Sequence, residues 1–187
     1  TGFFSSEVDF GAPFNEEDIK TSEGFTDSFL MKITSDATYN YTYTFGGTGR
    51  DYGKVVKTGE AGEIYLAGLF EEVVDFGSDF SQENLKEAKG LSDIFLLNIA
   101  EDDTLVDLKT FGSTSDEAVT SLLTDNDSGL FLLGTFSSDL NFKEDFNGTD
   151  LLIPYGDKDS FLIKITDNKY EYVKQFGNDN SEITETS

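Results

Sequence analysis

In several short stretches of the chain, an apolar or aromatic side chain occupies every second position. In residues 27–34, Phe29, Met31 and Ile33 occupy every second position, and residues 39–45 carry an aromatic ring at every second position. A period of two is the pattern of a β-strand, because successive side chains of a strand point to opposite faces of the sheet. We predict four short strands, over residues 27–34, 39–45, 52–58 and 63–70.

The same motifs return at a fixed step along the chain. The stretch DSFLMKI at residue 27 returns as DIFLLNI at residue 93 and as DSFLIKI at residue 159, a step of 66 residues each time. Motifs that share one step indicate a repeated structural unit. The 187 residues hold about 2.8 copies of this unit. Its central aromatic residues, Phe29, Phe95 and Phe161, are expected to be equivalent anchors of the core.

Each copy holds four predicted strands and a longer segment that leads to the next copy. The segment 71–92 aligns without gaps with its equivalents in the other copies. We expect an ordered loop there, with one short strand from Val73 to Phe76. A helical turn within residues 82–89 is an alternative in this copy only. Four antiparallel strands at a fixed period are typical of β-propeller blades. Solenoid rungs are shorter, and an immunoglobulin-like sandwich needs about seven strands.

We therefore predict an all-β chain of propeller-type blades, each with four antiparallel strands. Propellers have about 4–8 blades, so the chain is expected to be an incomplete ring or a fragment of a larger propeller. Residues 1–4 align with the end of a fourth strand, so one interpretation is that they complete the last blade. The alternative, which we favour, is that the 187 residues are cut from a longer propeller. The predicted division is residues 1–26 as the end of a preceding blade plus a linking segment, 27–70 as a blade, 71–92 as a linking segment, 93–136 as a blade, 137–158 as a linking segment, and 159–187 as a partial blade with strands one to three.

Four motifs together resemble a known repeat. They are Asp27-x-Phe-Leu-x-Lys, Thr44-Phe-Gly-Gly, the stretch GEIYLAGLF from Gly62, and Val74-Asp-Phe-Gly. In this order and spacing they resemble the bacterial β-propeller repeat called SBBP, and the resemblance covers essentially the whole chain. It implies a propeller fold and an exported or cell-surface setting, and it implies no activity. The chain departs from the family in its longer linking segment and in the turn at residues 59–62.

Composition removes several kinds of chemistry. The chain has 13 basic and 37 acidic side chains, a formal net charge of −24, and no histidine or cysteine. Without histidine and cysteine, the usual catalytic triads, zinc sites and disulfides are excluded. The negative charge repels nucleic acid and anionic lipid surfaces, so cationic partners or divalent ions fit better. No apolar run reaches the roughly 18–20 residues of a membrane helix, so we expect no membrane insertion.

Asp27, Asp93 and Asp159 begin the first strand of each copy. Equivalent carboxylates around a ring could line a channel and bind a cation. Alternatively, an Asp at the start of a strand accepts hydrogen bonds from the backbone amides of a turn. We favour the structural interpretation, because a residue that is present in every copy serves the fold first.

The stretch Asp125-Asn-Asp127-Ser-Gly129 is similar to the opening of a calcium loop. An EF-hand needs a bidentate Glu at position twelve of the loop, and that position holds Phe136, so an EF-hand is excluded. We expect a hairpin turn. A structural Ca²⁺ at Asp125 and Asp127 is the alternative, and no other metal or cofactor is expected.

Acidic residues are spread over every copy, and none interrupts the repeat as a uniquely placed catalytic pair would. We expect no catalytic residues. The expected function is a non-catalytic repeat module of an exported or cell-surface protein, which the resemblance implies to be bacterial, that serves as a scaffold or binds a protein or glycan ligand. The alternatives are a carboxylate-based hydrolase that acts on carbohydrates, and a repeat unit that assembles into homo-oligomers through open blade edges. A cleft in which non-repeated carboxylates converge would favour the hydrolase.

Overall fold

The computed structural model describes residues 1–125, 129–142, 146–148 and 150–178. The chain is all-β, with 57% of residues in strands and 4% in helices. The four predicted strands are confirmed to within one residue at each end. They are β4 Asp27–Ile33, β5 Tyr39–Phe45, β6 Tyr52–Thr58 and β7 Ile64–Phe70. Their repeats are β10 Asp93–Ile99, β11 Leu105–Phe111, β12 Ala118–Thr124, β13 Gly129–Phe136, β16 Asp159–Thr166 and β17 Lys169–Phe176.

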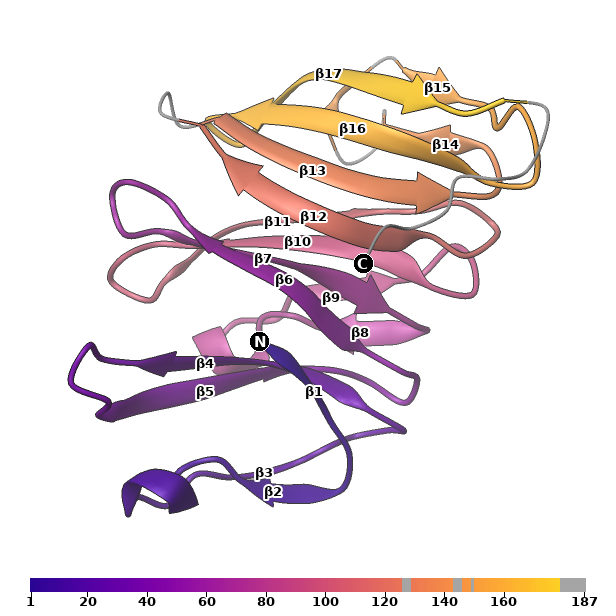
Figure 1. Ribbon diagram of the computed structural model, residues 1–187. Helices are drawn as coiled ribbons and strands as arrows, with labels where there is room; N and C mark the ends of the chain where they lie inside the picture. Colours follow the sequence, from indigo (N-terminus) through magenta and orange to yellow (C-terminus); the bar gives the residue numbers. More distant parts are fainter. Residues whose placement is uncertain (126–128, 143–145, 149, 179–187) are drawn as a thin grey trace.

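The strands form three main antiparallel sheets, none of which is closed. The first sheet has the order β1-β4-β5, where β1 spans Gly2–Phe4. The second has the order β11-β10-β7-β6, and the third has the order β12-β13-β16-β17. They follow one another along the molecule, with the second sheet in the middle (Figure 1). We call the contact between the first and second sheets the first junction, and that between the second and third sheets the second junction.

This pairing contradicts the predicted grouping of strands. Residues 27–70 do not form one sheet, because β4 and β5 pair with β1 whereas β6 and β7 pair with β10 and β11. The strands of residues 93–136 are divided between two sheets in the same way. The reason lies in the segment 71–92, which folds back as a hairpin of β8 (Val73–Asp75) and β9 (Leu85–Glu87). The end of β7 and the start of β10 therefore meet, with Phe70 opposite Asp93.

The N-terminal strand also has a different partner from the predicted one. Gly2 lies opposite Phe29 and Phe4 lies opposite Asp27, so residues 1–4 belong to the first sheet and not to the last. The third predicted strand of the last copy, in residues 179–187, lies outside the described residues.

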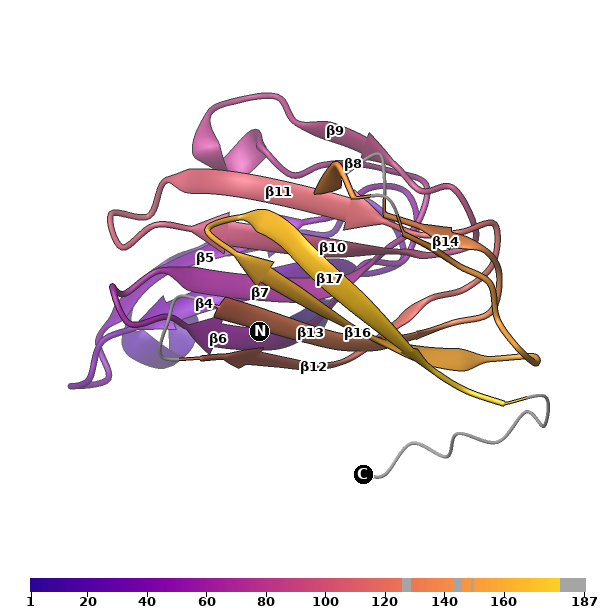
Figure 2. The ribbon, with the colours of Figure 1, turned by 90° about the horizontal axis from the view of Figure 1, so that it is seen from above.

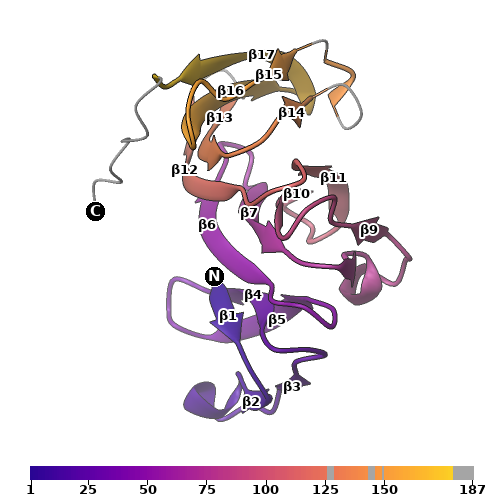
Figure 3. The same ribbon diagram turned by 90° about the vertical axis from the view of Figure 1, so that its right-hand side faces the viewer.

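Hairpins of the same kind recur outside the main sheets. They are β2–β3 (Glu7–Asp9 with Ile19–Thr21), β8–β9, and β14–β15 (Leu140–Asn141 with Leu151–Leu152). In Figure 3, β9 lies on the side of the molecule opposite to β6 and β12, and the hairpin β2–β3 lies below the first sheet, at the lower end of the view. The predicted short strand near Val73 is confirmed by β8.

The alternative of a helical turn within residues 82–89 is wrong, because β9 occupies that stretch. A 3₁₀ turn lies earlier instead, at Ser78–Phe80, and recurs at Ala12–Phe14. Asp75 holds this segment in place, since its Oδ1 accepts hydrogen bonds from the amides of Gly77 (2.9 Å) and Asn84 (2.8 Å).

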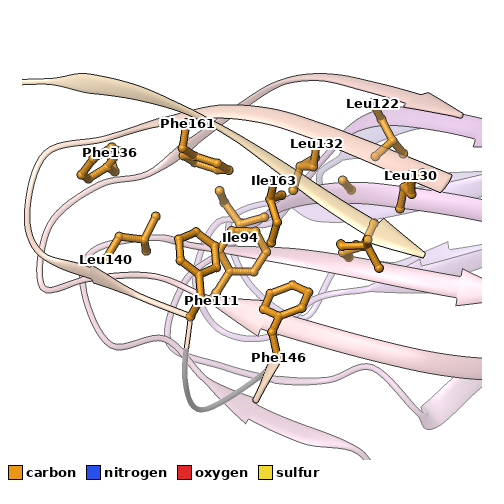
Figure 4. Close-up of a cluster of buried hydrophobic side chains, with 14 of the residues drawn as sticks. Ile94, Phe111, Leu122, Leu130, Leu132, Phe136, Leu140, Phe146, Phe161 and Ile163 are labelled. Atoms are coloured by element: carbon orange, nitrogen blue, oxygen red, sulfur yellow. The ribbon is translucent and has the colours of Figure 1, made fainter. Parts of the chain in front are cut away.

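The core fills both junctions. Every residue of β10 is buried, because the second sheet is covered on both of its faces. Ile94 belongs to the hydrophobic cluster of the second junction, and Phe95 and Leu97 belong to that of the first junction. Figure 4 shows Ile94 and Phe111 of the second sheet facing Phe161 and its neighbours in the third. Seen from above, the strands of successive sheets cross at an angle (Figure 2).

The three expected core anchors are not equivalent. Phe95 and Phe161 are fully buried, but Phe29 is only partly buried. The difference follows from position, because no further sheet of the described residues covers the other face of the first sheet. Phe29 packs against the rings of Phe4 and Phe10 instead, at centroid distances of 6.5 and 4.9 Å. Among the described residues, no helix has the length and apolar character needed to cross a bilayer.

Candidate functional site

The repeated aspartates at the strand starts are buried and hold turns. The exposed fractions of Asp27, Asp93 and Asp159 are 3%, 1% and 0%. Each accepts a hydrogen bond from the backbone amide four residues earlier, at 3.1 Å in all three copies. The structural interpretation of these residues is therefore confirmed. Burial raises the pKa of Asp27, and the hydrogen bond from the Glu23 amide partly opposes this shift.

The same aspartates explain the Phe-Gly motif that ends the second strand of each copy. A Cβ at Gly46 would lie 2.1 Å from the Asp27 Cγ, and a Cβ at Gly112 would lie 2.1 Å from the Asp93 Cγ. The carboxyl group thus occupies the space of a side chain at the glycine. Only glycine fits there, because contacts this short are sterically forbidden.

Sequence reasoning missed a second pair of repeated carboxylates, Asp51 and Glu117. They lie 66 residues apart and are 1% and 3% exposed. Asp51 accepts hydrogen bonds from the amides of Gly47 (2.9 Å) and Glu71 (3.1 Å), so it ties the connection between the first and second sheets to the end of β7. The shared step of 66 residues, with an acid at both positions, was the signal available in the sequence.

Burial raises the pKa of both groups to about 7. The hydrogen bonds from Gly47 and Glu71 to Asp51 oppose the shift, while the negative charge of Asp27 adds to it. For Glu117, the hydrogen bonds from Ser113 oppose the rise in pKa, and the negative charge of Asp93 adds to it. A pKa near 7 would suit a general acid. Neither carboxyl group lines any of the cavities found among the described residues.

A site that the other copies repeat only in part lies on β5, near the first junction. Tyr39, Tyr41 and Tyr43 line a groove of about 510 Å³, together with the side chains of Glu16, Glu17, Asp18 and Lys20. A second hollow of about 360 Å³ continues it, lined by Asp103 and the end of η2 (Ser78–Phe80), and the two share Tyr43 and Asp79. We call the two hollows together the tyrosine groove. The rings of Tyr41 and Tyr43 lie on one face of β5 and stack at a centroid distance of 4.2 Å. A bulge between Tyr39 and Tyr41 places Tyr39 opposite Ile33, on the other face, so the groove runs along β5 at the edge of the first sheet.

Carboxylates surround these rings. Asp103 Oδ1 accepts hydrogen bonds from Lys32 Nζ (2.5 Å) and from the Tyr41 hydroxyl (2.7 Å). Asp79 Oδ2 accepts a hydrogen bond from the Thr44 amide at 2.7 Å, and the Tyr39 hydroxyl donates to Asp18.

The environment of the groove raises the pKa of its tyrosines. Burial and the hydrogen bond to Asp18 raise the pKa of Tyr39 to about 12. Burial also raises the pKa of Tyr41 and of Tyr43, and nearby carboxylates add to both shifts. The hydroxyl groups therefore stay protonated at neutral pH and act as neutral donors in a negatively charged groove.

This groove belongs to the first copy of the repeat. One step of 66 residues further on, the positions of Tyr39, Tyr41 and Tyr43 hold Leu105, Asp107 and Lys109. The third copy keeps the first two rings as Tyr170 and Tyr172, and the Tyr170 hydroxyl donates to Asp150 as that of Tyr39 donates to Asp18, but Lys174 takes the place of Tyr43. Sequence reasoning used the three tyrosines as a strand signal and missed the groove. Their loss in the second copy was the signal that could have separated a site from the fold.

The calcium candidates are only partly described. Asp125 Oδ1 accepts a hydrogen bond from the Gly129 amide at 2.7 Å, and Oδ2 lies 3.5 Å from Lys164 Nζ. Asp125 thus closes a hairpin turn and pairs with a lysine. Asp127 lies outside the described residues. In the part of the chain that the structure describes, no group of three or more acidic side chains is arranged to hold a metal ion.

No family model matches the chain, and no curated protein matches it either.

Proposed function

We propose that the protein is a non-catalytic β-repeat binding module whose tyrosine groove docks a basic segment of a protein partner. The observation that carries this proposal is the groove itself, which joins three tyrosines to carboxylates from separate elements. Among the described strands only the first copy holds all three tyrosines, since the third copy keeps the first two as Tyr170 and Tyr172 and the second copy keeps none, so the fold of the other copies does not require the full set.

Charge favours a basic ligand. Five acidic residues line the groove, and Lys20 is the only basic residue among its lining. Lys20 already pairs with Asp18 at 3.3 Å. Tyrosine rings attract cations through their π-electrons, and the protein itself offers an example, since Lys32 Nζ lies 5.4 Å from the centre of the Tyr41 ring. The formal charge of −24 would also steer a basic partner toward the surface.

The partners of the carboxylates support a non-catalytic role. Asp51 and Glu117, which have a pKa near that of a general acid, are buried at equivalent positions of the repeat and away from the groove. Asp79 and Asp103 in the groove are engaged by a backbone amide, a tyrosine and a lysine. These contacts suit side chains that hold a surface in shape more than side chains that exchange protons with a substrate.

We further propose that the sheets are propeller-type blades of an exported or cell-surface protein. The second and third sheets support this proposal, because both take two strands from one copy and two from the next, in the same order. The resemblance to SBBP repeats supports the exported setting. A ring of about 4–8 blades would need further copies or further chains, so association into homo-oligomers belongs to the same proposal.

Fluorescence anisotropy with labelled peptides tests the proposed binding. A peptide of alternating lysine and glycine is expected to bind, and the same peptide with glutamine in place of lysine is not. Asp79→Asn should weaken binding several-fold, since it removes one charge and keeps an oxygen that can accept from the Thr44 amide. Glu83→Gln, an equal loss of charge at an exposed position, is the matched control.

Two results would overturn the proposal. If Asp79→Asn and Glu83→Gln weaken binding equally, the peptide responds to overall charge and not to the groove. If the lysine peptide does not bind but a neutral oligosaccharide binds in a manner sensitive to Asp79→Asn, the groove is a glycan site.

A further inference from the structure

A cavity of about 350 Å³ opens at the second junction, where three hairpin turns meet. The turn before β7, the turn between β10 and β11 and the turn between β16 and β17 contribute to it. We call it the second-junction pocket. Its polar lining residues are Glu63, Tyr65, Asn98, Glu101, Asp167 and Asn168.

The repeat supplies an internal comparison for this pocket. At steps of 66 residues, the position of Asn98 is occupied by Lys32 in the first copy and by Lys164 in the third. Lys32 Nζ reaches across the first junction and donates to Asp103 Oδ1 at 2.5 Å. Lys164 Nζ lies 3.5 Å from Asp125 Oδ2 and 3.7 Å from Glu171 Oε2. In both of these copies the ammonium group is held by carboxylates.

The second copy keeps the hydrogen bond across the junction but has an asparagine in place of the lysine that makes it in the first copy. Asn98 Nδ2 donates to Asn168 Oδ1 across the second junction at 2.9 Å, as Lys32 donates to Asp103 across the first. Asn168 and Asp103 are equivalent turn residues, and both have a left-handed backbone, with φ of 59° and 66°. A charged pair at the first junction is thus replaced by a neutral amide pair at the second.

The negative charge around that position remains. Glu63, Glu101 and Asp167 line the pocket, and no lysine or arginine of the described residues lines it. Burial raises the pKa of Tyr65, and the negative charges of Glu63 and Asp167 raise it further. In the other two copies, a lysine ammonium group at the equivalent position pairs with carboxylates. The second-junction pocket has three carboxylates and no such ammonium group among its described lining residues.

The buried side chain of Asn98 is a second, independent sign. Asn98 is 9% exposed, forms part of the pocket wall, and lies on β10 opposite Tyr65 of β7. Its Oδ1 is shielded from solvent and has no hydrogen-bond partner among the described residues. A buried amide oxygen without a partner is costly, and a donor bound in the pocket would remove that cost once the Asn98 amide rotates to meet it.

We propose that the second-junction pocket binds a primary alkylammonium group, which takes the place that the lysine Nζ holds in the other two copies. The ligand class is a lysine side chain or a free alkylamine, since both present the same ammonium group on a methylene stem. This site is separate from the tyrosine groove and does not depend on the function proposed for it.

The test is a titration of ¹⁵N-labelled protein with n-butylammonium chloride, followed by NMR. Saturable shifts are expected at the Asn98 side-chain amide and at the backbone amides of Tyr65 and Asn168, against a titration with sodium chloride at equal ionic strength. Nα-acetyl-lysine methylamide, in a parallel titration, distinguishes a lysine side chain from a free amine. Tetramethylammonium, which has no N–H donor, should not produce the same shifts.

Variants make the test specific. Asn98→Lys should abolish binding because it supplies an internal ammonium group, and the lysines of the other copies indicate that the repeat accommodates it. Glu101→Gln should weaken binding by about tenfold, as expected for the loss of one charge-assisted hydrogen bond. Glu83→Gln and Asp79→Asn should leave it unchanged, the latter because the tyrosine groove is a different site.

The proposal is overturned if butylammonium gives no saturable shifts at these residues. It is equally overturned if tetramethylammonium reproduces them or if Asn98→Lys binds as well as the unmodified protein, because the acidic surface would then act only as a diffuse charge.

Discussion

The two junctions are built from the same repeat, yet they differ at their edges. At the first junction the core packs Phe45, Phe76 and Phe95 among Leu and Ile side chains, and a lysine and an aspartate pair at its edge. The core of the second junction is a similar mixture of Phe, Leu and Ile, but an asparagine pair lies at its edge. β10 takes part in both cores, which is why its sequence DIFLLNI is nearly continuous in apolar residues while DSFLMKI of β4 alternates. The number of covered faces, and not the motif, determines how apolar each copy is.

Removing the ring that is buried at the first junction should have the largest effect. Phe95→Ala is expected to cost about 3–5 kcal/mol of unfolding free energy, because the side chain is fully buried between sheets. Phe29→Ala, at the equivalent position of the partly buried first sheet, should cost clearly less. Urea denaturation of both variants measures the difference. Equal losses would contradict the inference that the middle sheet differs from the outer one.

The glycine that packs on the buried aspartate gives the next largest effect. Gly112→Ala would bring a Cβ to 2.1 Å from the Asp93 Cγ, and the forced shift should cost about 1–3 kcal/mol. Gly46→Ala makes the same contact with Asp27 and should cost a similar amount. Gly2→Ala, whose nearest obstacle is the edge of the Phe29 ring at 3.0 Å, is the control. Thermal unfolding of the three variants would contradict this account if Gly2→Ala were the most damaging.

The strands could be predicted from the sequence and the sheets could not. The alternation in residues 39–45 reflects a local rule, and β5 spans these residues. Which strands share a sheet depends on the path of segment 71–92, whose hairpin pairs Val73 with Glu87. Such short strands carry little local signal, and the hairpin is held in addition by Asp75, which accepts hydrogen bonds from the amides of Gly77 and Asn84.

The structural role of Asp27, Asp93 and Asp159 could also be predicted, because turn aspartates obey a local rule. The tyrosine groove could not, because Asp79 and Asp103 come to Tyr43 from other elements. The second-junction pocket depends on turns that lie far apart in the sequence. In both cases the departure of one copy from the repeat was visible in the sequence, but its meaning required the contacts across a junction.

The stability of the protein should fall as pH rises from about 4 to about 7. Asp51 and Glu117 have a pKa of about 7 in the folded protein, against about 4 for Asp and Glu in an unfolded chain. The folded state therefore binds more protons than the unfolded state in this range. The stabilisation is complete below the unfolded pKa and is lost as pH rises through the folded pKa. Melting temperatures at pH 5.5 and pH 8 measure the effect.

Glu117→Gln separates this contribution from the general repulsion within an acidic protein, which changes with pH in the same direction. The amide mimics the protonated acid and can still accept from the Ser113 amide, which lies 2.9 Å from Glu117 Oε2. The variant should show a smaller decrease in melting temperature between pH 5.5 and pH 8. If its pH dependence equals that of the unmodified protein, the second junction does not hold a proton at Glu117.

The smallest effect is expected from exchanging the polar pairs of the two junctions. Lys32 and Asp103 are each about 30% exposed, so their ion pair should contribute no more than about 1 kcal/mol. The double variant Asn98→Lys with Asn168→Asp recreates that pair at the second junction, where Glu63, Glu101 and Asp167 add further negative charge. A double-mutant cycle in urea should give a coupling energy of the same sign as that between Lys32 and Asp103, reduced by salt.

The single change Asn168→Asp should destabilise the protein, because it adds a fourth carboxylate to a pocket without a cation. A stabilising Asn168→Asp would mean that the carboxylates of the second junction do not interact, and the difference between the two junctions would then be one of packing alone.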